Sequence, residues 1–363
     1  MSLNQFRFGL EAEFMLASAK DFRPLWHRDV TFKLLDEMFE SISLEGLPSL
    51  EGLSAEPPHK KLMPFIVEGY GIPDQDFIVQ DAYPKGIEIR TPVCHSLEQL
   101  FEVYEELYFR VKSALALKEM VPVAISHHPI ESHFRGPQNK RRHDYWLWAM
   151  EVMTTYGPDI NVSFPEDMTR QLFSNLDDLN CKVNYYAPAL AAISLASPFY
   201  EGAPWIIKGA EGKSYRTFKR SIIAPAIELH PDENFRIEFK VFEMSKKSKD
   251  FRNYFLLVLA LFLDESLKGR SSQHERIYDS GNVARFGLNA EGMRDRLLEI
   301  YTKAPAVLAK FGFDPSPLKE LASRIEFNLS PSDEMMEIYN KTQSIHSVIK
   351  EFSYLETLQG HLI

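Results

Sequence analysis

The chain has 363 residues, 45% hydrophobic and 25% charged, a composition typical of a soluble globular protein that excludes wholesale disorder. Asp and Glu outnumber Lys and Arg by 51 to 41, so the formal net charge is −10 and argues against nucleic-acid binding. Two cysteines, Cys94 and Cys181, are too few for a disulfide framework or a zinc ribbon and favour a reducing compartment.

The start of the chain and its most apolar run argue against secretion and membrane insertion. Charges appear at once in Arg7, Glu11 and Glu13, which is unlike a secretory signal. The apolar run at 254–263 is far shorter than the roughly 20 residues that span a bilayer, so it is interpreted as the buried centre of a helix. We therefore expect a soluble, cytoplasmic protein.

Apolar periodicity predicts a mixture of strands and helices along the chain. In chain order these are a strand at 5–16, a helix at about 29–42, a strand at 76–91, a helix at 96–118, strands at 121–127 and 158–164 with a helix at 141–155 between them, helices at 166–175 and 177–195, a strand at 234–243, and helices at 249–268, 290–311 and 332–354. Segments 43–75 and 200–233 are predicted to be rich in loops.

The distribution of these elements indicates the fold class. Strands are concentrated in the first two thirds of the chain and do not alternate regularly with helices, which favours an α+β fold with an antiparallel sheet. The chain is predicted to divide into a catalytic region at 1–247 and a helical C-terminal region at 248–363 that packs on it as one structural unit.

Four of the predicted strands have one apolar and one polar face. In the first strand, side chains alternate between faces, so the apolar residues lie on one side and two carboxylates lie together on the other. Three later strands repeat this arrangement. The polar faces carry Arg7, Gly9, Glu11 and Glu13; Glu88 and Arg90; Asp159, Asn161 and Ser163; and Arg236, Glu238 and Lys240.

Two interpretations of these polar faces are open. An antiparallel sheet with one solvated face gives the same alternation. However, the polar residues are mostly acids with a few cations, and Gly9 precedes the acid pair where bare backbone would let a ligand approach. Crowded carboxylates repel one another unless cations lie between them, and Mg²⁺ or Mn²⁺ prefers such oxygen ligands. The set therefore predicts a site for metal and phosphate on the sheet.

Ordered motifs in the chain resemble those of the glutamate–cysteine ligase family, a branch of the glutamine synthetase-like carboxylate–amine ligases, over roughly residues 5–245. Asp159 stands where the family strand begins with a histidine, and Lys240 stands where an arginine is usual. The motifs are Gly9-Leu10-Glu11-Ala12-Glu13-Phe14, Gly86 to Val93, Ser126-His127-His128-Pro129, Asp159 to Phe164, Leu190 to Gly202, Ser214-Tyr215-Arg216 and Glu238-Phe239-Lys240.

The resemblance implies a glutamine synthetase-like catalytic domain: a curved antiparallel sheet with an acid-lined inner face, flanking helices and a helical C-terminal part. It implies an ATP-dependent ligase that forms a γ-glutamyl amide through an acyl phosphate, as in glutathione biosynthesis. The implied roles are metal binding (Mg²⁺ or Mn²⁺) for Glu11, Glu13, Asp81, Glu88, Asp159 and Glu238, catalysis for Arg216, Arg236 and Lys240, ATP binding for Ser163, Arg216 and Lys240, and substrate binding for Arg90, Asn161 and His128.

The sequence leaves the exact reaction open. It contains no P-loop and no G-x-G-x-x-G after a strand, so ATP is expected to bind through metals. The expected partners are small molecules, a glutamate-like carboxylate and an amine, without nucleic acid or membrane; a homo-oligomer is left open. The alternatives are the same chemistry with another amine or acid, a metal-dependent phosphohydrolase, in which water attacks the phosphate, and a non-catalytic relative.

Overall fold

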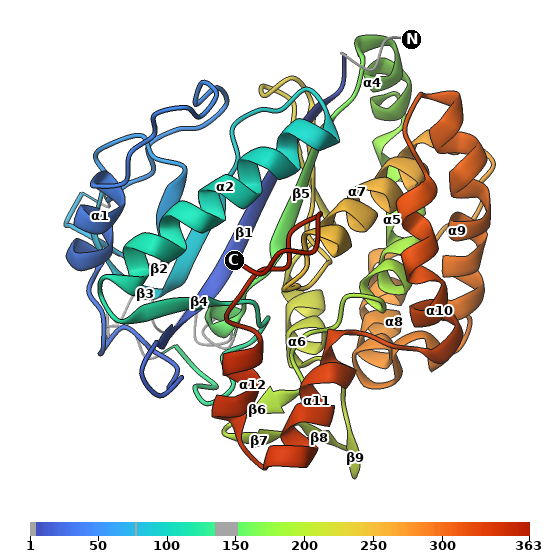
Figure 1. Cartoon of the computed structure of the whole chain (residues 1–363). Coiled ribbons are helices and arrows are strands. Elements are labelled where there is room, and N and C mark those ends of the chain that lie inside the picture. The colour runs from blue at the N-terminus through green and yellow to red at the C-terminus, as the bar shows by residue number, and fades with distance from the viewer. Residues whose placement is uncertain (1–4, 77, 135–151) are drawn as a thin grey trace.

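The computed structural model describes residues 5–76, 78–134 and 152–363. Seven antiparallel strands form one curved sheet in the order β10-β11-β5-β1-β3-β2, with β4 paired to the end of β1 (Figure 1). The strands are β1 (Arg7–Ser18), β2 (Phe65–Pro73), β3 (Val79–Arg90), β4 (Met120–Val123), β5 (Pro158–Ser163), β10 (Ile227–His230) and β11 (Arg236–Phe239), and two short ribbons add β6 (Phe199–Tyr200), β7 (Ala203–Pro204), β8 (Ile206–Ile207) and β9 (Ala210–Glu211).

Helices surround the sheet and make up most of the chain after residue 248. They are α1 (Phe32–Glu40), α2 (Leu97–Ala116), α4 (Glu166–Phe173), α5 (Leu176–Ala191), α6 (Tyr215–Ile223), α7 (Ser248–Leu263), α8 (Gln273–Phe286), α9 (Met293–Lys310), α10 (Ala322–Phe327), α11 (Pro331–Thr342) and α12 (Ile345–Glu351), with short 3₁₀ turns η2 (Val152–Thr154), η3 (Gly287–Asn289) and η4 (Ser316–Leu321). The predicted α+β class with an antiparallel sheet and a helical C-terminal part is confirmed.

The apolar face of the sheet is covered by α2 and α7, and Figure 1 shows α2 running across β1 and β3. Ser96 caps α2 by accepting a hydrogen bond from the Gln99 backbone N–H. The apolar run of α7 is buried, and its Phe255 ring packs edge-on against Phe8 of β1 and Phe101 of α2. This packing fixes the apolar face of β1 inward, so its acids must point to the opposite face.

Several predicted segments differ from the structure; for instance, the predicted helix at 332–354 is divided into α11 and α12. The predicted loop at 43–75 contains β2, which pairs with β3 along most of its length. Its residues Gly69, Gly71 and Pro73 are of types that are common in loops. The predicted loop at 200–233 contains α6 and β10. Of the predicted helix at 141–155, residues 141–151 lie outside the described residues, and 152–154 form the turn η2. Short strands with glycine and proline lack the apolar alternation on which the predictions rest.

A β-bulge interrupts the pairing of β2 with β3. Glu68 pairs with Gly86 and Gly69 pairs with Pro84, so Lys85 is the extra residue on β3. Glycine is required beside it, because a Cβ atom on Gly86 would lie 2.1 Å from the Phe14 carbonyl oxygen and one on Gly69 would lie 2.1 Å from the Tyr83 oxygen. The bulge thus depends on two glycines that let three strands approach closely.

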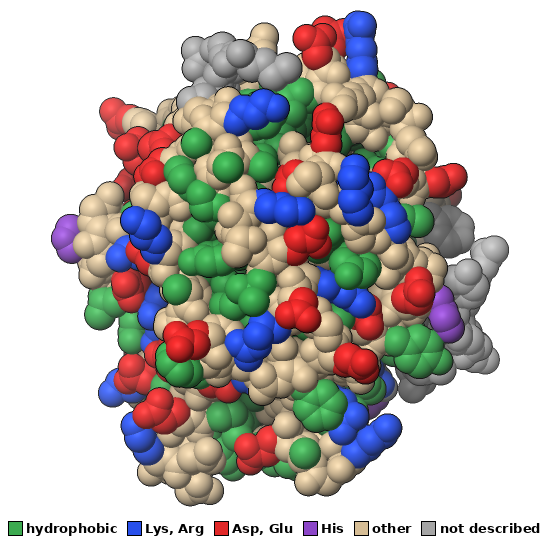
Figure 2. Space-filling view, turned by 90° about the vertical axis from the view of Figure 1, so that its right-hand side faces the viewer, with side chains coloured by type: hydrophobic (Ala, Val, Ile, Leu, Met, Phe, Trp, Pro, Cys, Tyr) green, Lys and Arg blue, Asp and Glu red, His purple; other side chains and the backbone are tan. Residues whose placement is uncertain are grey.

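On the face formed by the C-terminal helices, acidic and basic side chains are interspersed, without a broad area of one sign (Figure 2). Among the described residues, every helix is too short or too polar to cross a bilayer. The division into regions 1–247 and 248–363 stays a prediction, although one continuous hydrophobic core runs from β1 to the C-terminal segment.

We predict that Gly86→Ala lowers the free energy of unfolding by about 1–3 kcal/mol, because the added methyl group must push β3 away from β1. Gly281→Ala is the matched control: this glycine in α8 has open space around it, so alanine should stabilise the helix by about 0.5–1 kcal/mol. Urea unfolding of both variants checks this. Equal midpoints for Gly86→Ala and the wild type would contradict the close contact of the two strands.

Candidate functional site: an acid-lined sheet face

Strand pairing brings the polar residues of four strands onto one face. Glu11 on β1 lies opposite Arg90 on β3 and opposite Asp159 on β5. In the same way, Glu13 pairs with Glu88, while Asn161 of β5 pairs with Gly9 on one side and with Glu238 on the other. The alternation predicted from sequence is therefore confirmed, and the acids of distant segments become neighbours.

Among the described residues, three groups have carboxylate or imidazole ligand atoms that lie within 4.8 Å of one another. We name each group by one member. They are the Glu11 group (Glu11, Asp159 and Glu238), the Glu13 group (Glu13, Glu68 and Glu88) and the Glu228 group (Glu228, His230 and Glu238).

The Glu11 group lies at the centre of the face and is flanked by cations. The Lys240 ammonium is 3.1 Å from an Asp159 oxygen and also pairs with Glu238. The Arg236 guanidinium lies 3.0 Å from Glu238 and 3.9 Å from Glu11. These five side chains thus form one network of alternating charge.

The acids of this group differ in how readily they ionise. Burial, followed by the charges of Asp159 and Glu238, raises the pKa of Glu11 to about 8. Burial also raises the pKa of Asp159 to about 6, although Lys240 works against this shift. Burial opposes ionisation of Glu238 as well, but Lys240 and Arg236 outweigh it and hold its pKa at about 2. Glu11 is therefore the acid with the least compensation.

The Glu13 group lies beside the β-bulge and contains a lysine. The Lys85 ammonium is 2.9 Å from a Glu13 oxygen and 3.4 Å from a Glu68 oxygen. The second oxygen of Glu13 accepts a hydrogen bond from the Gly157 backbone N–H at 2.9 Å. Burial opposes ionisation of Glu13, yet the Lys85 charge and hydrogen bond lower its pKa. Burial and the neighbouring carboxylates raise the pKa of Glu88 well above its usual range.

The Glu228 group lies at the β10 edge of the sheet. The His230 imidazole is 2.9 Å from Glu238, and Lys240 is 3.6 Å from Glu228. Glu238 is also a member of the Glu11 group, and Lys240 also pairs with Asp159 of that group. The Glu228 group and the Glu11 group therefore share one carboxylate and one cation.

Helix α6 presents two arginines to the acids. Arg216 is buried and donates a hydrogen bond to the Phe242 carbonyl at 2.9 Å. A Cβ atom on Gly157, the residue before β5, would lie 2.0 Å from a nitrogen of the Arg216 guanidinium. Glycine at this position therefore leaves room for the guanidinium. Burial and the nearby Arg220 lower the pKa of Arg216 to about 10. Arg220 follows one turn later. For Glu13, burial raises the pKa and Lys85 lowers it, and the positive charges of Arg220 and Arg216 lower it further.

The start of α6 is held by a buried carboxylate. Glu243 accepts hydrogen bonds from the hydroxyls of Ser197, Ser214 and Thr217 and from the Ala196 backbone N–H. Ser214 in turn caps α6 through the Thr217 N–H. This network fixes the helix end that carries Arg216, which explains why the Ser-Tyr-Arg motif sits there.

A cavity of about 600 Å³ opens beside the Glu11 group. The sequence-predicted Arg90, Asn161, Ser163 and Arg236 line it, together with Gly9. Arg90 also anchors the loop at 43–64, donating to Glu56 and, at 3.0 Å, to the Ser54 carbonyl oxygen. The lining contains both charges: Arg7, Arg90 and Arg236 against Glu11, Glu51, Glu56, Glu233 and Glu238.

Two predicted site residues lie apart from these groups. Asp81 is exposed near the far end of the β2–β3 hairpin, opposite Ile72, and its carboxylate accepts the Ala82 N–H. His128 is buried in a turn, where its Nδ1 accepts the Glu131 N–H at 2.8 Å and its ring packs on Trp26. Neither belongs to the three ligand groups found among the described residues, so metal binding by Asp81 and substrate binding by His128 stay predictions.

The sequence analysis missed other members of the site. Glu68, Arg220 and His230 lie in segments predicted to be rich in loops. Lys85 was missed because strict alternation places it on the apolar face, and only the bulge turns it to the polar one. A signal for the bulge was present in Gly69 and Gly86, since isolated glycines in strands often mark such irregularities.

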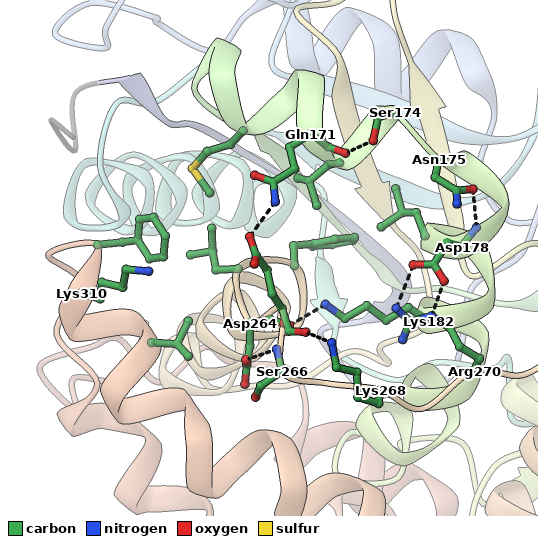
Figure 3. A pocket seen from close by; sticks show the side chains of 18 residues that line it. Gln171, Ser174, Asn175, Asp178, Lys182, Asp264, Ser266, Lys268, Arg270 and Lys310 are labelled. Carbon is green, nitrogen blue, oxygen red and sulfur yellow. Dashed lines mark hydrogen bonds and ion pairs between the residues drawn. The ribbon is translucent and has the colours of Figure 1, made fainter.

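A larger cavity, of about 760 Å³, lies between α4, α5 and the end of α7 (Figure 3). Its charged side chains are largely engaged with the protein: Arg270 pairs with Asp178 at 2.7 Å, and Lys182 donates to the Asp264 carbonyl at 2.8 Å. Gln171 likewise bonds Glu265. None of the three ligand groups found among the described residues lies in this cavity, so the acid-lined face is the candidate site.

Comparison with solved structures places this fold among ligases. The chain is similar to a bifunctional glutathione synthetase from Pasteurella multocida (TM-score 0.64, 12% identity, 97% of this chain and 52% of that one), so it spans about half of that protein. It is also similar to a glutamate–cysteine ligase from Francisella tularensis solved with AMP (0.65, 11%, 96% and 88%) and to the ligase PafA solved with the ubiquitin-like protein Pup (0.52, 13%, 96% and 68%).

No curated protein matches the chain. The model of glutamate–cysteine ligase family 2 matches residues 7–209, which is more than half of the chain. This range begins at β1 and includes the acids of β3 and β5. The chain therefore belongs to glutamate–cysteine ligase family 2.

Proposed function

We propose that this protein is an ATP-dependent carbon–nitrogen ligase that joins an amino-acid carboxylate to an amine through an acyl phosphate. Membership of a ligase family supports the reaction class. The observation that carries the proposal is the Glu11 group, which lies between the cations of α6 and β11 and opens to the 600 Å³ cavity. Phosphoryl transfer depends mainly on positioning and charge neutralisation, for which such a face is suited.

The Glu11 group fits a divalent cation. Its donors are carboxylate oxygens, the ligands that Mg²⁺ and Mn²⁺ prefer, and they are close enough to share one ion. The Lys240 ammonium contacts carboxylate oxygens of this group, those of Asp159 and Glu238. A metal ion that bound these oxygens would replace the ammonium as their cation. When bound, the metal would neutralise phosphate charge. The residues proposed to hold it are Glu11, Asp159 and Glu238.

The protein's own cations would share in binding the transferred phosphate. Arg216 has a fixed position, because Glu243 holds its helix and the Phe242 carbonyl orients its guanidinium. Arg236 of β11 and Lys240, the residue that follows this strand, border the same acids. As the phosphoryl group leaves ATP, its oxygens gain charge that these side chains would stabilise. We propose all three as catalytic cations and Ser163 as a polar contact for the nucleotide.

The mixed charge of the cavity suits a substrate that carries both signs. An amino acid such as glutamate has carboxylates that match Arg90 and Arg236 and an ammonium group that matches Glu51 or Glu56. Asn161 lies between Glu11 and Arg236, and its amide is held by both, so it is a rigid part of the cavity wall. We therefore propose an amino-acid carboxylate as the acid and leave the amine to experiment.

We predict that phosphate release from ATP requires Mg²⁺ or Mn²⁺ together with an amino-acid carboxylate and rises further when a suitable amine is added. A panel of acids and amines, assayed for inorganic phosphate with glutamate present or absent, checks this. Rapid hydrolysis of ATP or of phosphomonoesters without any carboxylate would instead identify a phosphohydrolase. The absence of turnover with every substrate pair, in protein that binds metal, would favour a non-catalytic relative.

Asp159 gives a test of the metal ligands. Asp159→Asn keeps the shape of the side chain but removes the charge, so we predict that apparent Mn²⁺ affinity falls about tenfold or more while the fold is retained. The control is Asp178→Asn, which removes an exposed carboxylate paired to Arg270 outside the site. Metal titration by calorimetry measures both. Unchanged affinity in Asp159→Asn would mean that this carboxylate does not bind the metal.

The two acids of β1 should affect metal-free stability in opposite directions. The pKa of Glu11 is about 8 in the folded protein and near 4.5 when unfolded, so folding takes up a proton between these values. The stability that Glu11 contributes is present at pH 4 and is lost as pH rises towards 8. Glu11→Gln should therefore remove part of the decline in stability between pH 5 and 8.

For Glu13 the expected direction is reversed. Its pKa is lowered by Lys85, so its contribution is present above pH 4.5 and is lost on acidification. Glu13→Gln should cost about 2 kcal/mol or more at pH 7, since it leaves a buried ammonium short of a partner. Urea unfolding across pH 4–8.5 in chelator measures both variants. Equal losses from the two substitutions would contradict the distinction between the acids.

A further inference from the structure

A positively charged side chain already lies inside the Glu13 group. Lys85 is 6% exposed, and its ammonium contacts Glu13 at 2.9 Å and Glu68 at 3.4 Å. A third contact is a hydrogen bond of 2.9 Å to the Thr155 carbonyl oxygen. The three donors of the ammonium thus have three acceptors, and the cation is held from three directions.

Lys85 is held by more than carboxylates. Its ammonium also lies 5.5 Å from the centre of the Tyr156 ring, and the Tyr156 hydroxyl donates to the Lys85 carbonyl oxygen at 2.7 Å. Among the described residues, by comparison, the Lys240 ammonium pairs with carboxylates alone, those of Asp159, Glu228 and Glu238. A metal ion entering the Glu11 group can therefore take over the contacts of Lys240, whereas it cannot take over the backbone and ring contacts of Lys85.

The backbone of β3 is shaped to deliver this lysine. Regular alternation would turn Lys85 to the apolar face with Ile87, and the bulge opposite Glu68 and Gly69 turns it to the acids. On the other side, Glu13 uses its second oxygen for the Gly157 N–H. Both the lysine and its main partner are therefore committed to contacts within the protein.

We infer that Lys85 is the resident cation of the Glu13 group, and that divalent metal binds at the Glu11 group and not at Glu13, Glu68 and Glu88. The ammonium neutralises these acids in place of a metal ion. This inference rests on the proposed function, because it concerns how many metal ions that site takes. It assigns Glu13 and Glu68 to positioning Lys85, and Lys85 to limiting the number of bound metal ions.

Removal of the ammonium tests the inference directly. In Lys85→Met the Glu13 group has three carboxylates and no internal cation, so we expect about one additional Mn²⁺ per chain. Bound Mn²⁺ is counted from the loss of the free-ion signal in electron paramagnetic resonance, which does not depend on turnover. Mn²⁺ should also raise the melting temperature of Lys85→Met more than that of the wild type, since the metal binds the folded state.

Lys246 provides a matched control. It is also 6% exposed, and it contacts one carboxylate (Glu334, 2.7 Å), one backbone carbonyl (Glu351, 3.2 Å) and one tyrosine ring (Tyr354, 5.1 Å), all outside the acid-lined face. Lys246→Met should leave the Mn²⁺ count unchanged. An equal count in Lys85→Met and in a metal-binding wild type would overturn the inference.

A second measurement applies if Lys85→Met does not fold. In protein that keeps Lys85, Glu68→Gln should retain the wild-type Mn²⁺ count, whereas Glu11→Gln should lose one ion. Loss of an ion in Glu68→Gln would show that metal binds beside the lysine and would overturn the inference. If the wild type binds no Mn²⁺ at all, the proposed function fails, and a gain of binding in Lys85→Met alone would still support the role of Lys85.

Discussion

The structure depends on charge compensation on one face of the sheet. This face carries many carboxylates, and their mutual repulsion must be offset for the strands to stay paired. Glu11, Glu13, Glu88, Asp159 and Glu238 come from four antiparallel strands and lie on a partly buried surface, where like charges repel strongly. The opposite face is fixed by phenylalanines and by α2 and α7, so the acids cannot rotate away without exposing the core. Cations must therefore come to the acids.

The protein supplies these cations from three different places. Lys240 and Arg236 come from β11 and the residues that follow it, Arg216 and Arg220 from α6, and Lys85 from the bulge in β3. Their distribution is uneven: Glu13 and Glu238 have lowered pKa values, whereas Glu11 and Glu88 have raised ones. Glu11 and Glu88 are thus the carboxyl groups that the protein's own cations compensate least, and of these two Glu11 lies in the group that we propose to bind metal.

Whether a residue of the site could be predicted depends on the pattern in the sequence around it. The strict alternation of β1, and of the segments around Glu88, Asn161 and Glu238, predicts the sheet and its polar face, because period 2 is a direct property of a strand. Glu68 and Lys85 could not be found in this way, because glycine-rich β2 lacks the pattern and a bulge breaks the alternation. The role of Asp81 was implied by the family resemblance, but the hairpin carries this residue to an exposed position.

The structure also relates two departures from the family pattern that the sequence presents as separate. Asp159 stands where the resemblance leads one to expect histidine, and Lys240 where it leads one to expect arginine, and their charged groups are 3.1 Å apart. An aspartate adds a negative charge to the Glu11 group, and a lysine carries the same positive charge as an arginine, but as a compact point charge in place of a planar fork. The negative charge that Asp159 adds is therefore offset locally by Lys240, which keeps the positive charge of the usual arginine. Because Lys240 also contacts Glu228 and Glu238, the pair links the metal ligands to the edge of the sheet, so neither residue can be interpreted without the other.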